Sequence, residues 1–97
     1  MNDYLEKLDI LPFHMRDGVR LWIERGIGPG SFLTAVLSND LFGALGRADE
    51  ENSRALKSYG VYFYSYAPSG CYGSPLRVAE WAKSGGLAGR GLLEQAA

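Results

Sequence analysis

The residues best suited to catalysis are a single histidine and a single cysteine, His14 and Cys71. A histidine can act as the base that activates a cysteine nucleophile, but no local signature joins these two residues. One histidine and one cysteine also supply too few soft ligands for a tetrahedral zinc site. We expect His14 to lie on the surface at a helix start and Cys71 to pack within a loop. The sequence therefore predicts no enzyme, no catalytic residue, no metal site and no cofactor.

Three further clusters have a structural interpretation. The glycine run 26–30 precedes an expected helix, but no Lys-Ser/Thr pair follows it and Pro29 lacks an N–H, so a turn is favoured over a phosphate site. The acidic cluster 49–51 suits the positive end of a helix dipole. Arg16, Arg20 and Arg25 alternate with acidic residues, which is typical of a solvated, ion-paired helix face.

Aromatic residues are the strongest candidates for a function. The chain contains six Tyr, four Phe and two Trp, with many of them in its second half. Tyr and Trp commonly anchor protein interfaces, but they also form core clusters with their polar tips in water, and the sequence does not decide between the two. The predicted partner-binding residues are Trp22, Tyr62, Tyr64, Tyr66, Tyr72 and Trp81, with Arg16 and Arg20.

Hydrophobic periodicity predicts that these residues stand on helices. Apolar residues recur with a helical period in four segments after a short N-terminal turn. Gly26 and the pair Gly85-Gly86 are expected to end helices, and Ser31 and Ser74 to cap them. Gly18, in the middle of a helix, is expected to permit close approach of another helix. The predicted helical segments are 2–10, 12–27, 31–46, 49–66 and 74–84.

Two of these segments have alternatives. Residues 61–66 combine high β-propensity with partial alternation, so a strand is an alternative there, but no other segment offers a strand to pair with. Asn39 and Asp40 either kink or split the helix of 31–46, and we favour a kink followed by a second short helix. The sequence thus predicts an all-α compact bundle of four to six short helices, with one domain over 1–86 and a mobile tail over 87–97.

Composition limits the classes of partner. With 10 Lys+Arg and 11 Asp+Glu the formal net charge is −1, so no basic field is available to hold nucleic acid. No apolar run is long enough to cross a membrane, and the N-terminus lacks the pattern of a signal peptide. A lone cysteine fits a reducing compartment. We expect a cytoplasmic protein that binds neither nucleic acid nor membrane.

Several stretches together resemble a group of small uncharacterised proteins of bacteriophages and prophages, over roughly residues 12–86. The resemblance implies a phage-borne accessory protein in the cytoplasm of a bacterial host, a class that includes inhibitors of host defence or host enzymes. The group offers no functional residue to carry over. The stretches that carry the resemblance are 15–27, 29–41, 47–49, 71–75, Pro68 and Trp81.

These observations predict a non-catalytic protein-binding module that acts on a host, phage or defence protein, with an anti-CRISPR-like role as one version. A homodimer is compatible with this function, because small helical proteins with uncovered apolar surface often pair about a two-fold axis. The alternative function is a small helix-turn-helix-like DNA-binding regulator, based on the helix, glycine turn and helix around 12–45. The near-neutral charge weighs against that alternative.

Overall fold

The computed structural model describes residues 3–93, and every regular element in that part of the chain is a helix. The prediction of an all-α bundle is therefore confirmed. Two elements, η1 and η2, are 3₁₀ turns. In chain order the elements are α1 (Asp3–Glu6), η1 (Lys7–Ile10), α2 (Phe13–Arg25), α3 (Ser31–Leu37), α4 (Leu41–Arg47), α5 (Glu50–Arg54), α6 (Leu56–Ser65), η2 (Ser69–Cys71), α7 (Pro75–Ser84) and α8 (Gly86–Gly89).

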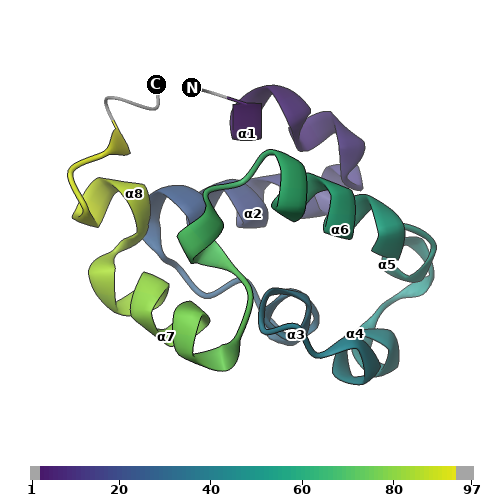
Figure 1. Ribbon diagram of the computed structural model, residues 1–97. Coiled ribbons are helices and arrows are strands. Elements are labelled where there is room, and N and C mark those ends of the chain that lie inside the picture. The colour runs from purple at the N-terminus through teal and green to yellow at the C-terminus, as the bar shows by residue number, and fades with distance from the viewer. Residues whose placement is uncertain (1–2, 94–97) are drawn as a thin grey trace.

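The helices enclose a core around α2 and α6. In Figure 1, α6 crosses the middle of the molecule in front of α2, with α7 and α8 toward one end, α4 and α5 toward the other, and α3 below the centre. Helix α8 packs against α2, α3 packs against α4, and η1 lies against α6. Of the helices that follow one another in the chain, α3 packs on α4 and α7 on α8, whereas α2 and α3, and α4 and α5, are joined by a loop without packing closely.

The core joins distant segments through aromatic side chains whose polar atoms are paired. Trp22 and Trp81 are both almost fully buried. The Trp22 Nε1–H donates to the carbonyl of Cys71 at 3.0 Å, and the Trp81 Nε1–H donates to the carbonyl of Trp22 at 2.9 Å. These bonds tie α2 to η2 and to α7. Because a buried N–H without a partner costs free energy, each bond also specifies how its indole ring is oriented.

Tyrosines make the same kind of connection at the N-terminal end. The Tyr62 hydroxyl of α6 donates to the carbonyl of Tyr4 at 2.7 Å, and the Tyr4 hydroxyl donates to Glu24 of α2 at 3.0 Å. Glu24 is itself buried and receives a hydrogen bond from Arg20 at 2.9 Å. Helix α1 is thus attached to both central helices.

Residues 61–66 are helical up to Ser65, so the strand alternative is wrong. The buried residues of α6 are Tyr59, Tyr62 and Phe63, which is the i, i+3, i+4 spacing of one helix face. The Phe32 and Tyr59 rings meet edge to face with their centroids 5.4 Å apart. This packing, which the sequence alone does not reveal, favours the helix over the local β-propensity.

Three of the predicted helical segments are divided in the structure, the first of them, 2–10, into α1 and the 3₁₀ turn η1. Helices α3 and α4 are separated at Asn39, which has a left-handed φ of 65°, and Asp40 then caps α4 by accepting the N–H of Gly43 at 3.0 Å. The segment 49–66 is divided at Ala55, whose N–H donates to both Glu51 and Asn52 at 3.1 Å. Such a shared bond marks a local tightening of the helix.

Two glycines differ from the sequence prediction, one at the start of α3 and one within α2. Gly30, with a φ of 93°, occupies the N-cap position of α3, and Ser31 is already the first helical residue. The left-handed backbone at this position favours glycine. At Gly18, a Cβ would meet nothing within 4 Å, so this glycine does not mark the close approach of another helix.

The domain extends beyond the predicted boundary at residue 86. Gly85 and Gly86 both have left-handed φ values, 80° and 67°, and they turn the chain back onto α2. Leu87 is buried, and the guanidinium of Arg90 lies 4.3 Å from the ring centroid of Trp81. Residues 87–93 therefore belong to the fold. The rest of the predicted mobile tail, 94–97, lies outside the described residues.

Candidate functional site, an apolar face on helices α4 and α6

Helix α4 leaves most of its apolar side chains exposed. Leu41, Phe42 and Leu45 have exposed fractions of 59%, 83% and 45%, and the only buried residue of the helix is Ala44. Isolated exposed apolar residues are ordinary, but three on one seven-residue helix form a patch of the kind that contacts partners.

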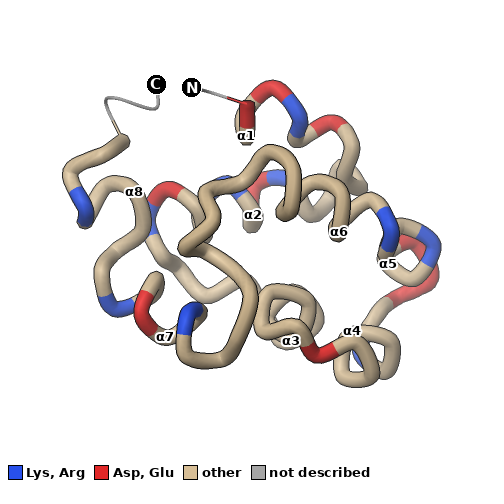
Figure 2. Tube along the Cα trace, in the orientation of Figure 1, with Lys and Arg blue, Asp and Glu red and all other residues tan. Residues whose placement is uncertain are grey.

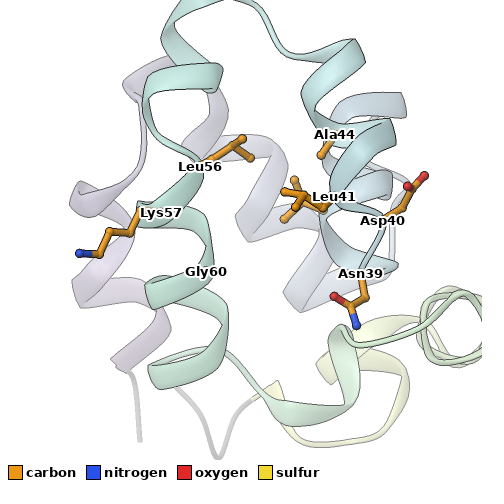
Figure 3. Close-up of a pocket in the computed structure, with 8 residues that line it drawn as sticks. Asn39, Asp40, Leu41, Ala44, Leu56, Lys57 and Gly60 are labelled. Atoms are coloured by element: carbon orange, nitrogen blue, oxygen red, sulfur yellow. The ribbon is translucent and has the colours of Figure 1, made fainter.

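A groove separates α4 from α6 beside this patch. Its volume is about 310 Å³. Figure 3 shows Leu41 and Leu56 directed toward each other across it, whereas Lys57 and Asp40 extend outward on its two opposite sides. The residues that line it are Val36, Asn39, Asp40, Leu41, Ala44, Leu56, Lys57 and Gly60.

A second hollow adjoins this groove, since Val36, Asn39 and Gly60 line both. Tyr64 and Tyr72 form part of its wall, and Tyr64 has an exposed fraction of 83%. We call the two hollows together with the exposed apolar residues of α4 the α4–α6 face. Leu41 and Gly60 line the first hollow and Tyr64 lines the second, whereas Phe42 and Leu45 are exposed on α4 and line neither.

The α4–α6 face carries little charge because the chain around it has almost none. Residues 26–39 and 58–76 contain no Lys, Arg, Asp or Glu. Figure 2 shows the corresponding tan stretches, with the charged residues gathered mainly on α1, α2, α5 and α7. Asp40 and Lys57 are the only charged residues that line the two hollows. Low charge and exposed apolar area fit a surface that a protein partner covers.

Three of the predicted partner-binding residues are core residues instead. Trp22, Tyr62 and Trp81 have exposed fractions of 1%, 0% and 2%. Each has its polar atom paired with a backbone carbonyl inside the molecule, so these aromatics are used by the fold. In the structure these three side chains therefore belong to the aromatic core.

The other predicted residues are divided between two places. Tyr64 and Tyr72 lie together in the α4–α6 face. Tyr66 lies elsewhere, half-buried, with the Lys7 ammonium 5.4 Å from its ring centroid. Arg16 donates to the carbonyls of Leu11 and Asp9, and Arg20 pairs with Asp17 and Glu24. The structure brings only the two tyrosines together.

His14 and Cys71 occupy unrelated environments. The ring nitrogens of His14 lie 3.2 Å from Asp49 and 3.1 Å from Glu51, on an exposed part of the surface where α2 and α5 begin. Cys71 is fully buried, and this burial raises the pKa of its thiol to about 12. A thiol that stays protonated at neutral pH is a poor nucleophile. His14 thus lies on the surface at a helix start and Cys71 is buried in a loop segment, the positions that the sequence predicts.

The helix-turn-helix alternative requires a helix whose exposed side chains can read DNA. Helix α3 would follow the glycine turn as the recognition helix, but four of its seven residues are buried and none is charged. A recognition helix needs exposed side chains that reach phosphates and base edges. Gly26 has a left-handed φ of 70° and its N–H bonds back to the carbonyl of Trp22, so it serves as the helix end.

The sequence interpretation did not identify Leu41, Phe42 and Leu45 as surface residues. In the sequence they continue the apolar period of residues 31–37, and this period predicts that they lie on the same buried face. The available signal was Asn39-Asp40 together with Gly43 and Gly46, which restart the helix and leave few large side chains with which to pack it. After the break at Asn39, the stripe of α4 is directed away from the core.

Comparisons with known proteins do not assign this chain to a family. No family model, no curated protein and no solved structure matches it. Over residues 3–93, no helix is both long enough and apolar enough to cross a membrane. In the same part of the chain no group of three His, Cys, Asp or Glu residues is arranged to hold a metal ion.

Proposed function

We propose that this protein is a non-catalytic protein-binding module that contacts its partner through the α4–α6 face. The observation that carries the proposal is the exposure of Leu41, Phe42 and Leu45 beside an apolar groove. Burial of such area drives most protein association. The resemblance to small phage proteins supports an accessory role in which the module covers a surface of a host, phage or defence protein.

The proposal can be tested by affinity capture with matched variants. Phe42→Asp places a charge on the exposed apolar side of α4. Gly60→Leu fills the groove and at the same time suits the helix, because Leu has a better helix propensity than Gly. Phe13→Asp is the control, since Phe13 is as exposed as Phe42, at 81%, and lies on α2.

We expect the wild-type chain and Phe13→Asp to retain the same protein from a bacterial lysate, identified by mass spectrometry. Phe42→Asp and Gly60→Leu should lose it, with unchanged circular dichroism. Equal capture by all four chains would contradict the proposal, because the α4–α6 face would then be dispensable for binding.

A further inference from the structure

The groove and the second hollow follow one side of α6. Leu56 and Gly60 line the groove, and Gly60 and Tyr64 line the second hollow. Because these positions are four residues apart, they lie along one helix face, and they span about 12 Å at a rise of about 1.5 Å per residue. The two hollows, with volumes of about 310 and 180 Å³, thus form one depression about two helical turns long.

Gly60 keeps this depression open at its middle. It lines both hollows, and a Cβ at this position would meet no other element of residues 3–93 within 4 Å. Packing within the described chain therefore does not require a glycine here, although glycine weakens the interior of a helix. A residue without a side chain allows the backbone of a second helix to approach α6 closely.

The walls of the depression suit a helix better than an extended chain. They are formed by α4, α6 and the end of α3, whose backbone N–H and C=O groups are bonded mainly within the helices. No strand in residues 3–93 offers a free edge. An extended segment would therefore bury backbone groups without partners, whereas a helix pairs its own. A helix that lays its apolar side in a groove is a recurring mode of recognition.

Lys57 supplies an uncompensated charge beside the groove. It extends on the α6 side (Figure 3), and no ion pair within residues 3–93 includes it. No acidic residue stands three or four positions from it, the spacing at which charges pair along a helix. On the opposite side, Asp40 is already engaged, because its carboxylate accepts the N–H of Gly43. An acidic side chain on the occupant would complement Lys57.

We infer that an amphipathic helix of the partner protein lies along α6 in this depression, with apolar side chains in the two hollows and an acidic side chain beside Lys57. The inference rests on the proposed function, because it gives the chemistry of the partner segment that covers the same face. Apolar side chains at i and i+4 of the occupant lie one turn apart, which matches two hollows that meet at Gly60.

Selection from a displayed library of random peptides, each of roughly 16 residues or about four helical turns, tests this occupant directly. We expect the immobilised wild-type chain to enrich peptides that have apolar residues at helical spacing and an acidic residue beside them. Gly60→Leu should weaken their binding by about tenfold or more, because it fills the depression. Gly18→Leu is the matched control, since it also adds a leucine at an open glycine within a helix, on α2.

Three results of this selection would overturn the inference. One is the absence of any enriched peptide. Another is a set of enriched peptides that lack a helical period or carry basic residues in place of the acidic one. The last is binding that Gly60→Leu leaves as strong as Gly18→Leu does.

A charge-reversal experiment tests the role of Lys57. Fluorescence anisotropy of a labelled enriched peptide should show that Lys57→Glu raises its dissociation constant by roughly tenfold, and that replacing the acidic residue of the peptide with lysine has a similar effect. The two reversals together should restore most of the affinity. Lys83→Glu is the control, because it makes the same charge change on α7. Two reversals whose effects simply add would overturn the proposed pairing.

The lysate capture separates this inference from the proposed function. A partner that is lost by Phe42→Asp but retained by Gly60→Leu would overturn the helix in the depression and support the protein-binding function. Capture unchanged by both variants would overturn both. A wild-type chain that dimerises in sedimentation, with Gly60→Leu monomeric, would assign the depression to a second copy and overturn the inference.

Discussion

At the scale of single residues, the aromatic side chains connect the fold through their polar atoms. Tyr59 is fully buried and its hydroxyl donates to the Asn52 side chain at 2.6 Å, and Tyr4 and Tyr62 make equivalent bonds. Desolvation raises the pKa of Tyr59 and Tyr62, and it raises the pKa of Tyr4 to about 12 with help from the adjacent Glu24. In the folded state these hydroxyls therefore keep their protons to a higher pH than free tyrosine does.

We therefore expect the protein to lose stability in alkaline solution. In the unfolded chain the thiol of Cys71 and the phenols ionise at their ordinary values of 9.0 and 10.0, whereas the folded state retains the protons toward pH 12. Because these folded pKa values are raised, their contribution is complete below pH 9 and is lost as the pH rises. Urea unfolding from pH 7 to pH 11 should show a falling midpoint above pH 9. A midpoint that stays level through pH 11 would contradict the burial of these groups.

At the scale of elements, glycines have opposite roles in α2 and at the start of α8. A Cβ on Gly86 would lie 2.7 Å from the backbone of both Gly26 and Ile23, where α8 meets α2. At Gly18 a Cβ would enter open space. Gly86 permits a close contact between two backbones, whereas Gly18 only adds flexibility to the unfolded chain.

Alanine at these two positions should change stability in opposite directions. Gly86→Ala should lower the free energy of unfolding by roughly 2–4 kcal/mol, from overpacking against fixed backbone and from a left-handed φ. Gly18→Ala should raise it by about 0.5–1 kcal/mol. Chemical denaturation of both variants checks this. A neutral Gly86→Ala would mean that α8 does not pack on α2 as described.

The sequence predicts where the helices lie better than it predicts which of their sides other elements cover. The stripe of Leu11, Met15, Val19, Trp22 and Ile23 predicts α2, and Gly26 ends it as expected. The division at Asn39 is also visible in the sequence. A stripe shows which side of a helix is apolar, but whether another element covers that side depends on tertiary packing. The sequence for this reason did not reveal that α4 exposes Phe42 or that Trp22 and Trp81 are enclosed.

At the scale of the whole molecule, the domain is closed by its C-terminal segment. The pair Gly85-Gly86 appears as a helix stop, which is correct for α7, but the chain continues as α8 and returns to α2. A stop signal ends one helix without indicating where the chain goes next. The core therefore includes Leu87, which has an exposed fraction of 5%.

Shortening the Leu87 side chain tests whether the domain includes residues beyond 86. Leu87→Ala should destabilise the protein by about 2–4 kcal/mol, which is typical of a large-to-small change in a core. Leu76→Ala is the matched control, because Leu76 is 68% exposed and should change stability by less than about 0.5 kcal/mol. If both variants lowered the thermal unfolding temperature by the same small amount, the domain would end at residue 86.

The enclosure of both indoles has a practical consequence for every variant discussed. Trp22 and Trp81 are the only tryptophans in the chain, and both are buried with their N–H groups bonded to carbonyls. Neither lines the α4–α6 face. Intrinsic tryptophan fluorescence should shift to longer wavelength when the chain unfolds and stay unchanged when the face is altered. The protein thus carries its own optical reporter, which distinguishes a variant that has lost its fold from one that has lost only its partner.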